Sequence, residues 1–225
     1  LRDDLPLRIQ HRSGVMWFLN SLGIDSLKLN SHSSGIPAGA VERDASGRAS
    51  GRIFRADDWL RTRLPASTPP DLATLGAELA GYGVTALTDC TPTNGEEELA
   101  RFRLAQETGA LPQRLCAMGT LGIANASNDR LQIGAHKIML DEPALPDFDD
   151  LIARVRAAHG ESRGVAFHCV TRAEIIFALA ALRAAETGCG NDRIEHASVA
   201  PPELFEEILS LGVSIVTQPN FVYER

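Results

Sequence analysis

The sequence predicts an α/β fold with a parallel sheet, and two observations support that prediction. From Val84 onward, short runs rich in β-branched residues alternate with amphipathic segments, which is the pattern of repeated strand–helix units. The runs at 164–168 and 212–216 are mainly apolar, as expected of strands that crossover helices bury on both faces. The helical segments between the runs exclude an all-β fold.

Strands and helices can be placed one by one along this part of the chain. The helix expected at 96–108 follows an Asn-Gly turn, and the helix at 149–159 begins with two acidic residues. A further helix opens at Pro201-Pro202-Glu203, where proline fits the first turn. The expected strands comprise residues 84–88, 113–118, 132–140, 164–168, 193–196 and 213–217.

The N-terminal part of the chain has a different pattern. We expect one strand at 7–10, a short helix around 17–22, and a loop rich in Ser, Gly and Pro from 30 to 51. Residues 1–70 are therefore predicted to form a cap or insertion segment, with 65–70 as its joint to a partial barrel at 71–225.

Six strands do not close a barrel, which usually has eight strands and about 250 residues. Open edges would expose unpaired backbone groups. Either the sheet is a smaller doubly wound one, or strands before Leu1 and after Arg225 complete it. We expect the second, because the sequence lacks an initiator Met and ends directly after a strand.

Charge and composition exclude several classes of partner. The net charge is −7 with acids and bases interspersed, so no nucleic-acid or membrane-surface binding is expected. The longest apolar stretches, such as 175–182, are too short to span a bilayer. The expected partner is a small-molecule substrate, and a homo-oligomer is compatible with the sequence. The cysteines form no CxxC pair, which favours reduced thiols in a cytoplasmic protein; they are Cys90, Cys116, Cys169 and Cys189.

Three polar residues lie in or at the end of successive predicted strands: Lys137, His168 and His196. The carboxyl ends of parallel strands meet at one face of the sheet, so these side chains are expected to converge. Neutral imidazole is a common zinc ligand. A lysine becomes a ligand only when carbon dioxide converts its amine to a carbamate. The three residues are therefore candidate metal ligands.

Each of these residues also has a purely structural interpretation. A histidine can cap a strand, and Lys137 can form an ion pair with Asp141 on the same strand face. The same alternation puts His136 on the opposite face, so a structural role is expected for it. Surface positions are expected for His159 and His32.

Several short motifs follow one another along the second half of the chain: Lys-Ile-Met-Leu-Asp141, Ala-Phe-His168, Arg-Ile-Glu-His196-Ala-Ser, Pro-Pro-Glu-Leu and Thr-Gln-Pro-Asn-Phe221. Together they resemble the fourth to seventh strands of the amidohydrolase superfamily, in its family-3 or YtcJ-like branch. Gly-Val-Thr-Ala-Leu-Thr-Asp89 is similar to the second strand. Gln-His-Arg-Ser-Gly14 and Leu-Asn-Ser21 are similar to the insertion after the first strand. Each motif is weak alone, but their order and spacing together are specific.

The resemblance implies a (β/α)8 TIM barrel of the metal-dependent hydrolase type, with about strands two to seven in this chain. It implies one or two divalent metal ions, with zinc expected. Lys137 would be the carboxylated bridging lysine, and His168 and His196 would be ligands from the fifth and sixth strands. Arg12 and Asn20 would be cap residues near the substrate, with surface or loop-bracing roles as the alternative for both.

The resemblance also implies residues that orient the site, namely Asp89, Gln218 and Asn220, although turn formation is an equal explanation for the last two. Two departures from the family pattern stand out. Val15 replaces a histidine of many relatives, and the first-strand His-x-His pair is absent from the sequence. The eighth-strand Asp, usually the general base, is expected beyond Arg225.

The function implied is hydrolysis of a non-peptide C–N bond by a metal-activated water. Two alternatives are open. The barrel could be a non-catalytic remnant or ligand-binding protein, which the missing ligands favour. Lys137 could instead form a Schiff base, because desolvation activates a buried lysine as a nucleophile.

Overall fold

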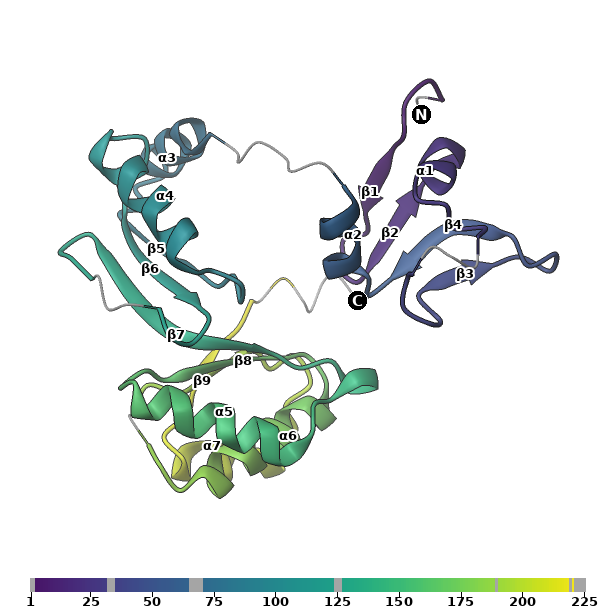
Figure 1. Cartoon of the computed structure of the whole chain (residues 1–225). Coiled ribbons are helices and arrows are strands. Elements are labelled where there is room, and N and C mark those ends of the chain that lie inside the picture. Colours follow the sequence, from purple (N-terminus) through teal and green to yellow (C-terminus); the bar gives the residue numbers. More distant parts are fainter. Residues whose placement is uncertain are drawn as a thin grey trace. The chain divides into compact units, whose positions relative to one another are not determined.

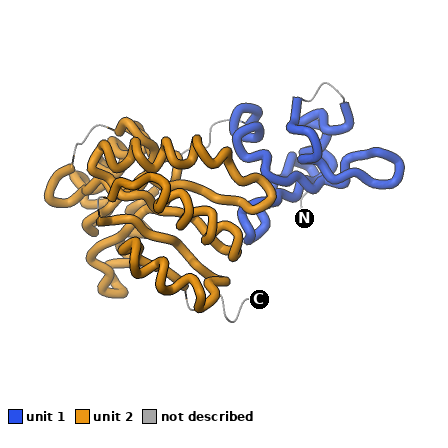
Figure 2. Tube along the Cα trace, turned by 90° about the horizontal axis from the view of Figure 1, so that it is seen from below, with its two compact units in different colours: residues 1–70 blue, residues 71–225 orange. Residues whose placement is uncertain are grey.

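The computed structural model describes residues 3–31, 35–64, 71–123, 127–188, 190–218 and 220. The chain divides into two compact units, residues 1–70 and 71–225 (Figure 2). The segment expected to join them, 65–70, lies outside the described residues. Each unit has its own core, so each is described by itself.

The first unit is built on a four-stranded antiparallel sheet with the order β1-β2-β4-β3 (Figure 1). Its core is formed by Leu29, Ile53 and Leu60, whose side chains are fully buried. The elements are β1 (Arg8–Gln10), β2 (Met16–Leu19), α1 (Ser21–Ser26), β3 (Val41–Arg43), β4 (Ala49–Phe54) and α2 (Asp57–Arg63). The strand expected at 7–10 is confirmed as β1.

Two predictions for this unit are wrong. The helix expected around 17–22 begins only at Ser21, because Asn20 caps it by accepting a hydrogen bond from the Gly23 N–H at 2.9 Å. Trp17 lies in β2 instead, paired with Ile53 of β4.

The loop expected at 30–51 contains β3 and the start of β4. Asp44 shapes the turn between these strands by accepting hydrogen bonds from the backbone N–H groups of Ser46 and Arg48. The turn-forming residues that suggested a loop therefore belong to a β-hairpin.

The second unit contains a six-stranded parallel sheet, which confirms the predicted strands. The sheet order β10-β9-β8-β7-β6-β5 follows the chain without a reversal, and the ribbon curls along it (Figure 1). A doubly wound sheet changes direction at a switch point, so the described sheet is a half-barrel. The strands are β5 (Ala86–Asp89), β6 (Arg114–Gly119), β7 (Leu131–Met139), β8 (Val165–Cys169), β9 (Arg193–His196) and β10 (Ser214–Val216).

Helices connect these strands, and capping residues start several of them. Asp147 caps α5, and Thr171 forms a capping box with Glu174 at the start of α6. The helices expected at 96–108, at 149–159 and after Pro201 are confirmed, whereas α3 and α6 had not been placed. The elements are α3 (Leu72–Gly81), α4 (Glu96–Glu107), η1 (Glu142–Ala144), α5 (Phe148–Gly160), α6 (Arg172–Ala185), η2 (Pro202–Leu204) and α7 (Phe205–Ser210).

The two faces of the half-barrel carry different side chains. Ile138, Phe167 and Ile194 lie side by side on β7, β8 and β9, are fully buried, and share a core with α5 and α6. Figure 1 shows α5, α6 and α7 on that face. Because side chains alternate along a strand, Lys137 and His168 point to the opposite, concave face. The sequence pattern thus separates an apolar helix-covered face from a polar one.

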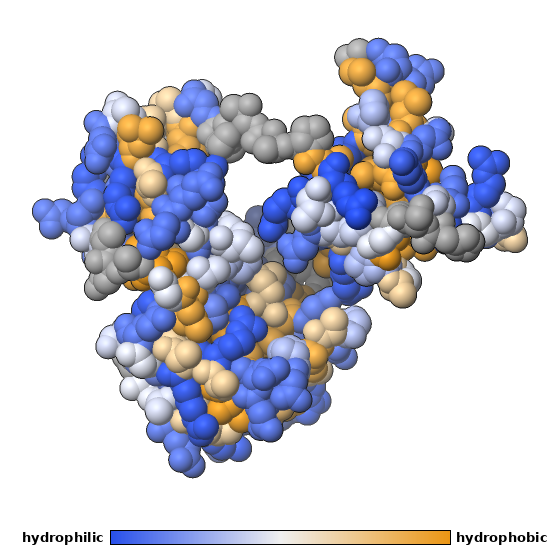
Figure 3. Space-filling model, in the orientation of Figure 1, coloured by the Kyte–Doolittle hydropathy of each residue, from blue (hydrophilic) through white to orange (hydrophobic). Residues whose placement is uncertain are grey.

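The surface of the molecule is mixed. Hydrophilic residues cover much of the face in Figure 3, and apolar residues appear among them in smaller groups. Within the described ranges, no helix combines the length and apolar character needed to cross a membrane.

Candidate metal site

The three candidate ligands come from three adjacent strands. Lys137 lies in β7 beside Ala166 of β8, while His168 lies in β8 beside Glu195 of β9. His196 is the last residue of β9. The parallel register therefore brings the three residues to neighbouring positions near the carboxyl ends of the strands.

The rings of His168 and His196 are close together. Their centroids lie 4.6 Å apart in an edge-to-face arrangement with an interplanar angle of 77°. A tetrahedral ion bound to one nitrogen of each ring at about 2.0–2.1 Å would hold two centroids about 5 Å apart. The observed separation therefore suits two ligands of one cation.

An unusual backbone turn accompanies this arrangement. His196 and Ala197 have φ angles of +70° and +47°, the left-handed region that side chains other than glycine rarely adopt. The Ala197 N–H donates to the Cys169 carbonyl at 2.9 Å, which ties the turn to β8. Strict alternation would put His196 on the helix-covered face with Ile194, so the turn re-aims its ring.

The environments of the two imidazoles differ. Burial, helped by the nearby charges of His196 and Lys137, lowers the pKa of His168 to about 4, so its ring is neutral at pH 7. His196 Nδ1 lies 2.6 Å from Gln218 Oε1. A contact of this kind fixes the orientation of the imidazole ring.

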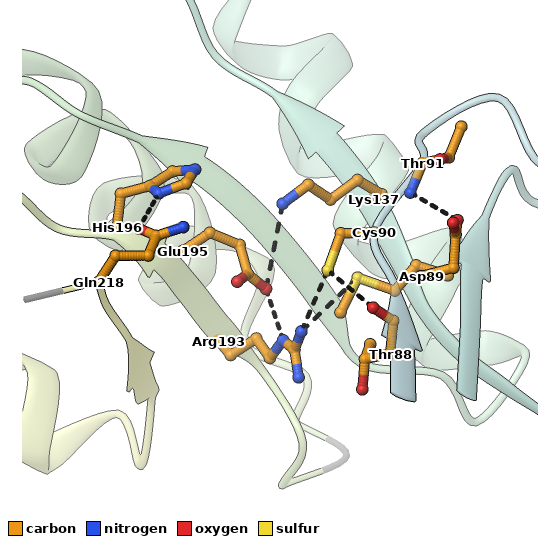
Figure 4. Close-up of polar contacts among 10 residues, drawn as sticks. Thr88, Asp89, Cys90, Thr91, Lys137, Arg193, Glu195, His196 and Gln218 are labelled. Carbon is orange, nitrogen blue, oxygen red and sulfur yellow. Dashed lines mark hydrogen bonds and ion pairs between the residues drawn. The ribbon is translucent and has the colours of Figure 1, made fainter. Parts of the chain in front are cut away.

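Lys137 is buried beside a carboxylate. Its Nζ lies 4.0 Å from Glu195 Oε1, and both side chains are less than a tenth exposed (Figure 4). Burial lowers the pKa of Lys137, while Glu195 acts in the opposite direction. A lowered pKa makes the neutral amine more accessible, and that amine is the form that reacts with carbon dioxide or a carbonyl group.

Two residues of this site were not identified from the sequence: Glu195 and Arg193. Period-two alternation had pointed to Asp141 as the partner of Lys137, whereas the structure pairs Lys137 with Glu195 on another strand. Arg193 Nε donates to the same Glu195 oxygen at 2.6 Å. The sequence signal that could have revealed them is the Arg-Ile-Glu spacing, which places both charges on one strand face. Their contact with Lys137 follows only from the parallel register of the strands.

The residues expected to orient the site fall in different places. Gln218 contacts His196 as described above. Asp89 shapes the loop between β5 and α4, because its carboxylate accepts from the Thr91 N–H at 3.0 Å and the Asn94 amide at 2.6 Å. Asn20 braces the first unit, and Arg12 lies in the turn between β1 and β2. Substrate contacts by Asn20 and Arg12 stay predictions.

Two further histidines of the second unit have structural roles. His136 is buried, and its Nδ1 lies 3.0 Å from the Gly119 carbonyl; burial lowers its pKa. The surface position expected for His159 is wrong. The last turn of α5 packs it against the start of β9, where its Nε2 lies 2.9 Å from Asp192 Oδ1 and its side chain is 4% exposed. His32 lies outside the described residues.

The donor set fits a cation only with Lys137 included. Within the described ranges, no group of three His, Cys, Asp or Glu residues is placed to hold a metal ion. His168 and His196 would supply two imidazole nitrogens, and a carboxylated Lys137 would add oxygen ligands. The residues present therefore fit a divalent ion through two imidazoles and a modified lysine.

Comparisons with known proteins agree with the fold. The chain matches the model of the amidohydrolase family over residues 3–225. Six solved protein chains match it. One is a crystal structure of an uncharacterized metal-dependent hydrolase from Pyrococcus horikoshii OT3, with a TM-score of 0.67 and 18% sequence identity. The match covers 97% of this chain and 50% of that one, so the chain spans about half its length. No curated protein matches the chain.

Proposed function

Because the chain belongs to the amidohydrolase family, we propose that it forms part of the metal site of a hydrolase that cleaves a non-peptide C–N bond. The observation that carries this proposal is the 4.6 Å approach of the His168 and His196 rings at the ends of adjacent parallel strands. The substrate is proposed to be a small molecule, because pockets at the carboxyl ends of barrel strands accept such ligands.

His168 and His196 would hold the ion through one ring nitrogen each, with Gln218 fixing the orientation of His196. Lys137 would join them after its neutral amine adds to carbon dioxide, forming an N–C bond and releasing one proton. The resulting carbamate carries one negative charge shared by two oxygens, which can bind one or two ions. Nitrogen and oxygen donors in this combination suit zinc.

When bound, a divalent ion here would supply Lewis acidity, which lowers the pKa of water towards 7 and polarises a carbonyl group. His168, His196 and Lys137 would hold and orient the ion on the concave face of the sheet. Ile138, Phe167 and Ile194 seal the opposite face of the sheet. The proton acceptor stays the predicted eighth-strand Asp. The described cysteines Cys90, Cys116 and Cys169 are free, which supports the proposed cytoplasmic location.

A second function for Lys137 is supported by its burial alone. A desolvated lysine with a lowered pKa can attack a carbonyl compound and form a Schiff base. Borohydride would trap such an adduct on Lys137 as a stable mass increase after incubation with aldehydes or ketones. Tight zinc binding that protects Lys137 from the same reagents would exclude this chemistry.

The metal proposal is tested by elemental analysis of purified chain loaded with zinc and then desalted. Wild-type chain is expected to keep zinc, whereas Lys137→Ala and His196→Ala should lose most of it while their circular dichroism spectra stay unchanged. His11→Ala, in the first unit, removes an imidazole elsewhere and serves as the control. Wild-type chain that keeps no zinc, or variants that keep as much as wild type, would refute the proposal.

A further inference from the structure

The ion pair of Lys137 spans two strands. Lys137, Ala166 and Arg193 lie side by side in register on β7, β8 and β9. Neighbouring strands are about 4.8 Å apart, so the Lys137 and Arg193 backbones are roughly 10 Å apart. The small side chain of Ala166 leaves room above β8, and across it the Lys137 amine approaches Glu195 (Figure 4).

Glu195 is held from the other side by Arg193. The Arg193 guanidinium donates through Nε to Glu195 Oε1 at 2.6 Å, the same oxygen that faces Lys137. Its Nη2 reaches Cys90 Sγ at 3.7 Å and Met118 Sδ at 3.9 Å, on the other side of the concave face. The Arg193 guanidinium is thus held by Glu195 through Nε and by the two sulfur atoms through Nη2. Glu195 in turn lies between two cationic side chains.

The charges of Lys137, Arg193 and Glu195 would affect the binding of a nearby cation. Glu195 precedes His196 and lies beside His168 in register. Its negative charge offsets that of Arg193, which would otherwise repel a divalent ion. A carboxylated Lys137 would keep one N–H, and Glu195 could accept it. The same carboxylate can therefore orient either form of Lys137.

We propose that Glu195 is the positioning residue of Lys137: anchored by Arg193, it directs the lysine nitrogen towards the His168–His196 pair and balances the charge of the partly buried guanidinium. This inference rests on the proposed function, because it assumes that a cation binds beside the two imidazoles. Residues that orient metal ligands typically change metal affinity by about 10–100-fold when mutated.

Cobalt(II) titration of the chain tests this, because d–d absorption reports both affinity and ligand geometry. Glu195→Gln keeps the shape of the side chain and is expected to weaken cobalt binding by about 10–100-fold, with an altered spectrum. The double variant Arg193→Met/Glu195→Gln restores the net charge but not the carboxylate, so its affinity should lie between those of Glu195→Gln and wild type. Glu203→Gln removes an exposed carboxylate paired with Arg172 and should bind like wild type.

The outcomes separate this inference from the proposed function. Glu195→Gln with wild-type affinity and spectrum would overturn the inference alone, as would a double variant weaker than Glu195→Gln. Wild-type chain that binds no cobalt would contradict the proposed function as well. If Glu195→Gln does not fold, the double variant is compared with Arg193→Met. Both of these variants lack the Arg193 guanidinium, so they differ only at position 195. The inference requires that the double variant bind cobalt more weakly than Arg193→Met.

Discussion

The rings of His168 and His196 meet edge to face with their centroids 4.6 Å apart, although the two residues belong to different strands and His196 should alternate to the other side. The left-handed backbone at His196 and Ala197 makes this meeting possible. Such conformations cost about 1–3 kcal/mol each and persist where the surrounding structure requires them. Here the hydrogen bond from Ala197 to Cys169 and the contact of His196 with Gln218 hold the backbone in this conformation.

Glu174 should matter for the loops that follow β7 and β8. Its buried carboxylate accepts hydrogen bonds from the backbone N–H groups of Glu142, Val170 and Thr171, at 2.9, 2.6 and 2.9 Å. Glu174→Ala leaves these donors without the carboxylate and should lower the free energy of unfolding by about 3 kcal/mol in urea titrations. Glu203→Ala, at an exposed position, should change it by less than about 0.5 kcal/mol. Equal effects would contradict the role assigned to Glu174.

Gly164 and Gly160 form a matched pair at the end of α5. A Cβ at Gly164 would lie 2.3 Å from the Asn191 carbonyl oxygen, whereas nothing lies within 4 Å of a Cβ at Gly160. Gly164→Ala should therefore lower the free energy of unfolding by about 1–3 kcal/mol. Gly160→Ala, in the last helical turn, should raise it by about 0.5–1 kcal/mol. Denaturant unfolding measures both, and a harmless Gly164→Ala would show that β8 and β9 approach less closely.

The stability of chelator-treated chain should depend on pH through His168. Its pKa is about 4 when folded, against about 6.5 for a free imidazole. Between these values the unfolded chain binds a proton that the folded chain does not, so the free energy of unfolding falls as the pH falls from 6.5 to 4. Below the folded pKa this contribution levels off. Urea unfolding at several pH values should give a shallower dependence for His168→Gln; an unchanged dependence would refute the burial of a neutral ring.

The sequence predicted those features that have a local physical signal. The strands of the half-barrel could be predicted because strands that are buried on both faces consist of apolar runs, such as Val-Ala-Phe at 165–167. The hairpin of β3 and β4 was missed because Asp44, Ser46 and Gly47 look like loop residues unless their pairing partners are known. Helix α1 was placed too early because Trp17 and Leu19 are apolar in either conformation.

For the site, the three candidate ligands could be identified because each stands near the end of its own strand. Glu195 and Arg193 could not be connected to Lys137, since their contact depends on the register of β7, β8 and β9 and on the small size of Ala166. His159 was misplaced for a similar reason. Its partner Asp192 lies 33 positions further along the chain, so only tertiary packing reveals the pair.

Anomalous diffraction at the zinc edge from zinc-soaked crystals of the chain would show whether His168 and His196 bind a common ion. A zinc peak is expected about 2.0–2.1 Å from one ring nitrogen of each histidine, with additional density on the Lys137 nitrogen. A zinc peak elsewhere, or ring nitrogens of the two histidines that bind no common ion, would contradict the proposed metal site.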